Sequence, residues 1–254
     1  MITTGIDHQK IAFIDIETAY PERDIFNLPA ALAAAWARVV DHKYANEMSD
    51  TVTYNDLYKK YAGLYPEFSK IVCISVGYFS SPTEFKVNAF YGKDGSEKSL
   101  IEEFSEVWTR LSTNCKHIGG HNIKGFDVPF IIRRALINNI TLPMVFSLYN
   151  AKPWEVVQFV DTMDMWKPLN ANLGSATLDS IAAALGFKSP KDEMSGDLVS
   201  TVYHMPENVN SPLKNIQKIG KYCNGDVITT AFVYVRLTKG DNFMRTMKVI
   251  ANSF

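Results

Sequence analysis

The sequence predicts an α/β fold in which a mixed sheet of about five strands is flanked by helices. Two features of the 254 residues predict it: early apolar runs have strand length, and later apolar residues recur at helical spacing. Strands that open as a meander and then alternate with crossover helices are typical of a mixed sheet. Because 46% of the residues are hydrophobic, the chain can build one large core, and we expect a single domain spanning residues 1–254.

The charge balance and the cysteines exclude several classes of protein. With 26 basic and 27 acidic residues, the net charge of -1 gives no sign of duplex wrapping or of a membrane surface. Cys73, Cys115 and Cys223 are too scattered for a disulfide framework or a CxxC metal site, so we expect reduced, structural thiols. No apolar run approaches the roughly 18 residues of a membrane span and no signal peptide is evident, which predicts a soluble, cytoplasmic protein.

The first three strands are defined by apolar runs. Residues 10–17 form a run of branched apolar residues, as expected of a central strand buried on both faces, and the run ends in Asp15 and Glu17. Residues 71–79 and 84–91 also have strand composition, and the turn-forming residues between them predict a hairpin.

Helices and shorter strands alternate through the rest of the chain. Residues 97–112 carry apolar side chains at helical spacing, with Ser96 as the expected N-cap. A brief strand at 117–120 precedes a helix that starts at Asp127 and runs to about residue 138. Further predictions are a strand at 156–160, a helix at 178–185 closed by Gly186, and one or two helices over 212–237.

Residues 20–69 interrupt this pattern after the first strand. The stretch 28–40 is rich in alanine and has strong helix propensity. A second group of residues recurs at helical spacing: Tyr54, Leu57, Tyr58 and Tyr61. The segment is therefore interpreted as a helical insertion, and we expect its aromatic side chains to serve packing rather than stacking on a ligand.

Asp15 and Glu17 are the first candidates for a functional site. They lie two apart on a predicted strand, so both side chains leave the same face, within apolar sequence. Two ionised carboxylates there are unfavourable unless a raised pKa, a basic partner or a metal offsets them. The alternative is a carboxylate pair that caps the turn after the strand.

Two later segments carry further candidates. One loop places Asn122, Lys124 and Asp127 beside the predicted end of the sheet, where it could approach a phosphate chain; for Asp127 alone, an N-cap is the alternative. Tyr222 and Asp226 are four apart on a predicted helix and therefore share one face. For that pair the alternative is a buried tyrosine hydrogen-bonded to a neighbouring aspartate.

In combination, these residues resemble the three motifs of a known family. The segments 13–18, 122–127 and 222–226 resemble the motifs of the DEDD exonucleases, in the subgroup with tyrosine in the third motif. The likeness is greatest to predicted exonucleases related to the proofreading domain of family B DNA polymerases, and it runs from about residue 10 to residue 237. The resemblance implies a ribonuclease H-like fold.

The resemblance also implies a metal-dependent 3′-5′ exonuclease. It implies that two divalent cations, Mg²⁺ or Mn²⁺, act on the phosphodiester, with oxygen ligands from Asp15, Glu17, Asp127 and Asp226. Asp15 would contact both cations, Glu17 and Asp226 the one on the nucleophile side, and Asp127 the other. Tyr222 would orient the attacking water, because a phenol is a poor base at neutral pH.

The expected substrate is the 3′ end of single-stranded nucleic acid, with DNA favoured over RNA and nucleoside 5′-monophosphates released. Asn122 and Lys124 are candidate substrate contacts. Two alternatives stay open: a catalytically silent nucleic-acid-binding module, and an accessory proofreading subunit that acts beside a separate polymerase or replication protein. Lys191 is a weak candidate for a substrate contact. Four other polar residues near the motifs are not expected to act as metal ligands or bases: Asp161, Asp164, His121 and His204.

Overall fold

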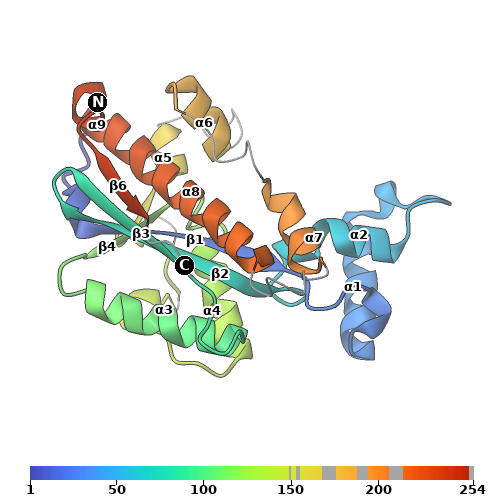
Figure 1. Cartoon of the computed structure of the whole chain (residues 1–254). Helices are drawn as coiled ribbons and strands as arrows, with labels where there is room; N and C mark the ends of the chain where they lie inside the picture. Colours follow the sequence, from blue (N-terminus) through green and yellow to red (C-terminus); the bar gives the residue numbers. More distant parts are fainter. Residues whose placement is uncertain (149, 153–154, 168–175, 188–193, 206–213, 252–254) are drawn as a thin grey trace.

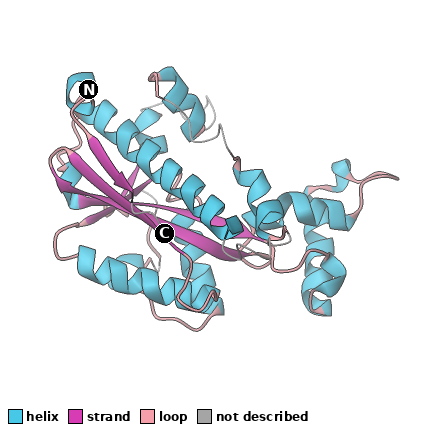
Figure 2. Ribbon diagram, viewed as in Figure 1, coloured by secondary structure: helices cyan, strands magenta, loops and turns pink. Residues whose placement is uncertain are grey.

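The computed structural model describes residues 1–148, 150–152, 155–167, 176–187, 194–205 and 214–251. Its centre is a six-stranded mixed sheet with strand order β5-β4-β1-β2-β3-β6, between helices on both faces (Figures 1 and 2). The strands are β1 (Ile11–Ala19), β2 (Lys70–Ser81), β3 (Glu84–Phe90), β4 (His117–Gly120), β5 (Phe159–Asp161) and β6 (Lys248–Ala251). The predicted α/β class is confirmed.

The strand pairing places β1 inside the sheet. β1 pairs antiparallel with β2, and β2 with β3, so the predicted hairpin is confirmed. β4 lies parallel to β1 on its other side, and β5 lies parallel to β4. The sixth strand, β6, was not predicted; it pairs parallel with β3 at the edge, and all four of its residues are exposed.

The predicted helices are present, with the start of the one predicted over 212–237 lying outside the described residues, and three short helices, α5, α7 and α9 below, were not predicted. Ser96 caps its helix by accepting a hydrogen bond from the Ser99 backbone, and Gly186 takes a φ of 80° after the helix that it closes. A single long helix stands where one or two were expected. Among the described residues, the helices are α1 (Ala30–Lys43), α2 (Tyr54–Tyr61), α3 (Glu97–Leu111), α4 (Asp127–Ile137), α5 (Thr162–Trp166), α6 (Leu178–Ala184), α7 (Val199–Tyr203), α8 (Lys214–Thr238) and α9 (Asp241–Met244).

Helices cover both faces of the sheet. On one face α3 and α4 pack a core that includes Phe104 and Ile131; on the other, α8 packs on Phe13 of β1 (Figure 1). Gly77 of β2 leaves room for Phe85 and for Val227 of α8, because a Cβ there would overlap both side chains. β1 is thus buried from both sides, as predicted for a central strand.

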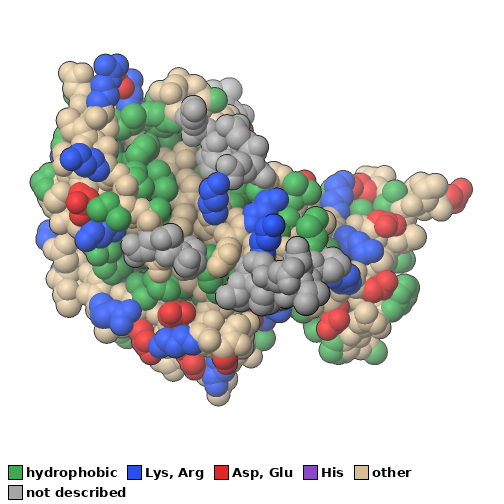
Figure 3. Space-filling view, viewed as in Figure 1, with side chains coloured by type: hydrophobic (Ala, Val, Ile, Leu, Met, Phe, Trp, Pro, Cys, Tyr) green, Lys and Arg blue, Asp and Glu red, His purple; other side chains and the backbone are tan. Residues whose placement is uncertain are grey.

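The insertion after β1 extends from one end of the sheet, where Figure 1 shows α1 and α2. It has its own core, in which Trp36 and Tyr58 are fully buried, and the rings of Tyr44 and Tyr61 stack with centroids 4.2 Å apart. Lysines and arginines are dispersed over the face shown in Figure 3, in keeping with the net charge of -1. No described helix is both long and apolar enough to cross a membrane.

Candidate active site

Asp15 lies at the middle of β1 and Glu17 two residues further on, both on the face that α8 covers. Across the β1–β2 pair Asp15 stands opposite Ser75 and Glu17 opposite Cys73, and the register shifts directly after Glu17. Such irregularities redirect side chains and are frequent beside active sites. One carboxylate oxygen of each acid and the sulfur of Cys223 on α8 all lie within 4.8 Å of one another. The prediction that the two carboxylates share a face is confirmed.

α8 carries Tyr222 and Asp226 to the same place. The two residues are one turn apart and both are buried. Burial and the neighbouring Asp226 carboxylate raise the pKa of the Tyr222 hydroxyl, and the same carboxylate raises the pKa of Asp15 further than burial does alone. A buried hydrogen bond of 2.9 Å from Ser75 Oγ to Asn224 Oδ1 fixes the rotation of α8 over β2.

Asp127 reaches the site from the opposite helical layer. It is the first residue of α4, and the N-cap position belongs to Phe126, which makes no side-chain cap. Asp127 Oδ1 accepts a hydrogen bond of 3.1 Å from the backbone N–H of Ile16, between the two acids of β1. β4 pairs with β1 only as far as Phe13, so this N–H has no strand partner on that side. The alternative that Asp127 is only an N-cap is therefore wrong.

These four carboxylates, Asp15, Glu17, Asp127 and Asp226, are called the acidic cluster below. Burial, then Asp226 and Asp127, raise the pKa of Asp15 well above its usual range. Burial, then Asp15 and Asp226, do the same to the pKa of Glu17. Burial raises the pKa of Asp127 to about 8, although its hydrogen bond from Ile16 opposes the shift.

The acidic cluster has the donor set of a site for hard cations. Among the described residues, no lysine or arginine forms an ion pair with Asp15, Glu17 or Asp127. Buried like charges of this kind need protons or bound cations to be stable. Mg²⁺ and Mn²⁺ prefer carboxylate oxygens, so the residues present fit divalent cations.

The raised pKa values predict how stability depends on pH when cations are removed. Between the ordinary 3.8 and the folded value of about 8, Asp127 holds its proton in the folded state but not in the unfolded chain. Stability must then fall as the pH rises through this window, and Asp15 and Glu17 act in the same direction. Urea unfolding in EDTA at a series of pH values should show the decline, and Asp127→Asn should make it shallower. An equal slope in both proteins would contradict the shifted pKa.

The loop before α4 is shaped by Asp161. This buried carboxylate accepts hydrogen bonds from the backbone N–H of Asn122 at 2.9 Å, of Lys124 at 3.2 Å and of Met163 at 2.9 Å. Asn122 takes a left-handed φ of 57°, which asparagine tolerates. The Lys124 ammonium lies 3.0 Å from the exposed carboxylate of Asp164. Asp161 thus has a structural role in shaping this loop.

Both histidines near the motifs are held by hydrogen bonds in the described structure. Both ring nitrogens of His121 are engaged at 3.0 Å, one with Thr162 Oγ1 and the other with the carbonyl of Ala176. His204 stacks on Tyr20 and its Nε2 lies 2.8 Å from the Tyr20 carbonyl. The weak candidate Lys191 lies outside the described residues.

Sequence reasoning missed the neighbours of the acidic cluster. Cys223 Sγ lies 3.3 Å from Asp15 Oδ2, and Cys73 stands opposite Glu17, although both thiols were expected to be merely structural. Cys223 and Asp226 are three apart in a helix, a spacing that places them on one face. That spacing could have found Cys223 from the sequence.

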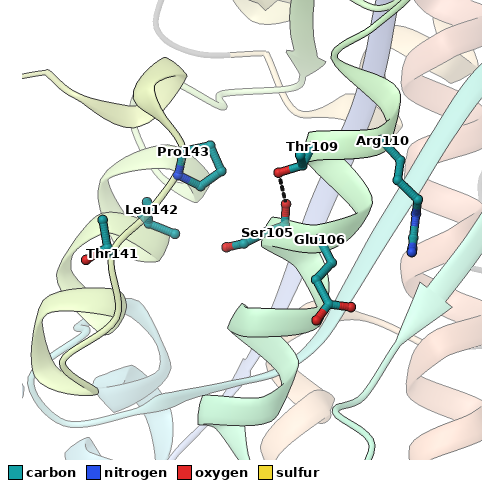
Figure 4. A pocket seen from close by; sticks show the side chains of 7 residues that line it. All are labelled: Ser105, Glu106, Thr109, Arg110, Thr141, Leu142 and Pro143. Carbon is teal, nitrogen blue, oxygen red and sulfur yellow. Dashed lines mark hydrogen bonds between the residues drawn. The ribbon is translucent and has the colours of Figure 1, made fainter.

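A separate hollow lies on the other side of the molecule. It has a volume of about 580 Å³ and lies between α3 and residues 141–143, with Ser105 and Thr109 on one wall and Leu142 and Pro143 on the other (Figure 4). No residue of the acidic cluster lines it. It is therefore distinct from the candidate site.

The fold and the acidic cluster define a class: an α/β domain with a carboxylate site on its central strand. Residues 64–251 match the family model described as a predicted 3′-5′ exonuclease related to the exonuclease domain of PolB. The chain belongs to this family, as the motifs predicted, and it is thus an exonuclease-related domain.

Comparison with solved structures agrees with the fold. The family B DNA polymerase from the hyperthermophilic archaeon Pyrobaculum calidifontis matches with a TM-score of 0.50 and 15% identity, over 93% of this chain and 26% of that one. At this identity the likeness concerns the fold alone, and it confirms the predicted ribonuclease H-like class. The chain therefore spans only about a quarter of the polymerase's length. No curated protein matches the chain.

Proposed function

We propose that the protein is a metal-dependent exonuclease that removes nucleotides from the 3′ end of single-stranded nucleic acid, with DNA favoured over RNA. The observation that carries the proposal is the meeting of Tyr222 and the acidic cluster, whose members come from β1, α4 and α8. Membership of an exonuclease-related family supports the reaction class. The products would be nucleoside 5′-monophosphates.

The acidic cluster would hold two divalent cations, Mg²⁺ or Mn²⁺. When bound, the cations supply charge that stabilises the reacting phosphate and eases proton loss from the attacking water. Asp15 is the best candidate for a ligand shared by both, because Asp226 and Asp127 are both close enough to raise its pKa. Glu17 and Asp226 would complete one position, and Asp127 the other.

Tyr222 is assigned a positioning role. Burial and the carboxylates of Asp226, Glu17 and Asp15 raise the pKa of its hydroxyl, so the group keeps its proton at neutral pH. A protonated phenol can orient water by hydrogen bonding but cannot remove its proton. Lys124 remains a candidate for a phosphate contact, since exposed ion pairs such as that with Asp164 are weak.

The function is tested with labelled oligonucleotides. With Mn²⁺, a single strand labelled at its 5′ end should shorten stepwise from the 3′ end, while a circular single strand should remain intact. Matched DNA and RNA strands give the preference. If the strand is bound but never shortened, the protein is a silent binding module; shortening only of mismatched primers beside a polymerase would indicate an accessory proofreader.

Tyr222→Phe tests the positioning role. The attacking water becomes negatively charged as it loses its proton, and a hydrogen bond to a charged group is worth about 1.5–3 kcal/mol, so turnover should slow about ten- to a hundredfold. Mn²⁺ affinity, measured by electron paramagnetic resonance, should stay unchanged because no carboxylate is removed. Tyr54→Phe, which removes an exposed hydroxyl bonded to Asp41 in the insertion, is the matched control. Equal turnover in both variants would refute the role.

A further inference from the structure

Cys223 lies inside the group of potential ligand atoms at the acidic cluster. Its sulfur is 3.3 Å from Asp15 Oδ2 and 3.4 Å from the Asp15 carbonyl oxygen, and it is fully buried. With the carboxylate oxygens of Asp15 and Glu17 it forms the one set of three His, Cys, Asp or Glu ligand atoms that converge within 4.8 Å among the described residues. The Cys223 sulfur is therefore placed to bind the same ion as the carboxylate oxygens of Asp15 and Glu17.

Glu17 supplies an independent sign that a ligand is needed. Only 7% of its surface is exposed, and no hydrogen bond to its carboxylate is present among the described residues, although its oxygens are not fully enclosed. A largely buried carboxylate without a protein partner is unfavourable. Because its oxygen points at Asp15 and Cys223, a cation at that point would satisfy all three groups.

A second thiol, that of Cys73, lies beside Cys223 and makes this part of the acidic cluster richer in sulfur. Cys73, on β2 opposite Glu17, is fully buried and lies in the same core cluster as Cys223. Hard cations such as Mg²⁺ avoid sulfur, whereas Zn²⁺ and Cd²⁺ favour it. Sulfur and oxygen bound to one tetrahedral Zn²⁺ lie about 3.6 Å apart. The observed 3.3 Å between Cys223 Sγ and Asp15 Oδ2 is close to that separation.

We propose that Cys223, with Asp15 and Glu17, binds thiophilic divalent cations such as Zn²⁺, which thereby exclude the catalytic cations and inhibit the enzyme. Binding forms a Zn–S bond and breaks the S–H bond, and the proton is released to solvent. This inference rests on the proposed function, because it assigns a regulatory ligand to the same centre. Mg²⁺ does not compete for the thiolate, so Zn²⁺ holds the centre even when Mg²⁺ is in excess.

The test uses Cd²⁺ alone as a spectroscopic probe of the whole chain. Titration of the wild-type protein should produce the ultraviolet charge-transfer band of thiolate bound to Cd²⁺, and Cys223→Ser should abolish it. Cys115→Ser is the matched control, because Cys115 is also buried but packs in the core on the other face of the sheet. A band that persists in Cys223→Ser, or is missing from the wild type, overturns the proposal.

Zn²⁺ affinity gives a second readout. Loss of a residue that only supports the ligands of a metal site weakens metal binding about 10- to 100-fold. Cys223 would be a direct ligand, so Cys223→Ser should weaken Zn²⁺ binding by at least about tenfold. Mn²⁺ affinity should change far less, since Mn²⁺ is held by oxygen. Equal loss of both affinities would overturn the proposal, because it would mean a general disturbance of the site.

The variant's folding does not limit the test. X-ray absorption at the cadmium edge of the wild-type complex shows directly whether sulfur or only oxygen is bonded to the ion, and oxygen alone overturns the proposal. If the wild type binds Mn²⁺ but shows no sulfur bonded to Cd²⁺, only this inference fails. If the wild type binds no Mn²⁺, the proposed function fails first.

Discussion

Replacing Asp15 by alanine is expected to abolish cleavage of single strands while the protein stays folded. Asp226 and Asp127 both lie close enough to Asp15 to raise its pKa, so its loss removes the ligand that both cations would share. Loss of a residue that only supports the ligands of a metal site lowers activity by up to about a hundredfold. Loss of a ligand shared by both cations should therefore lower the cleavage rate by at least about that factor. The measurement is the shortening of a 5′-labelled strand in Mn²⁺. Asp50→Ala, which removes an exposed aspartate in the insertion, is the matched control.

The same variant separates a functional from a structural role for Asp15. In EDTA its carboxylate is destabilising, because burial and the neighbouring Asp226 and Asp127 raise its pKa. The thermal midpoint of Asp15→Ala in EDTA should therefore hold steady or rise. A clear fall would mean that the fold depends on Asp15, and the loss of activity would then say nothing about metal binding.

Local periodicity accounts for the parts of the site that could be predicted. The two-residue spacing of a strand placed Asp15 and Glu17 on one face, and the four-residue spacing of a helix did the same for Tyr222 and Asp226. Local spacing could not show that this face of β1 and this face of α8 lie against each other. It follows from the packing of α8 on β1 and β2, and before the structure only the resemblance to a family indicated it.

Tertiary contacts account for what could not be predicted. Asp127 looked locally like an N-cap, but its hydrogen-bond partner is Ile16, 111 residues away in the sequence. Cys73 and Cys223 have no metal-binding spacing in the sequence, and they meet only because α8 crosses β2. The edge strand β6 escaped prediction because four exposed residues carry too little pattern.

Replacing Arg134 by methionine should cause the largest loss of stability. Arg134, near the end of α4, donates hydrogen bonds of 2.8 Å to Glu97 Oε1 and 2.7 Å to the Pro66 carbonyl, and both charged side chains are largely buried. Glu97 also accepts hydrogen bonds from the Ile71 backbone at 2.7 Å and from Asn138 at 2.9 Å. Removing one partner of a buried pair leaves the other charge uncompensated, which costs about 3–5 kcal/mol. Urea unfolding with cations present measures the change.

Two comparisons isolate the unpaired charge as the cause. Lys98→Met, at the residue next to Glu97, removes an exposed lysine whose contact with Glu102 is 4.0 Å, and should change stability by less than about 1 kcal/mol. The double variant Glu97→Gln/Arg134→Met keeps an amide oxygen for Ile71 but removes the buried charge, so it should be more stable than Arg134→Met alone. If the double variant is the less stable of the two, the loss comes from packing and not from charge. The charge of this ion pair would then contribute little to holding the start of α3 against α4, the helix that carries Asp127.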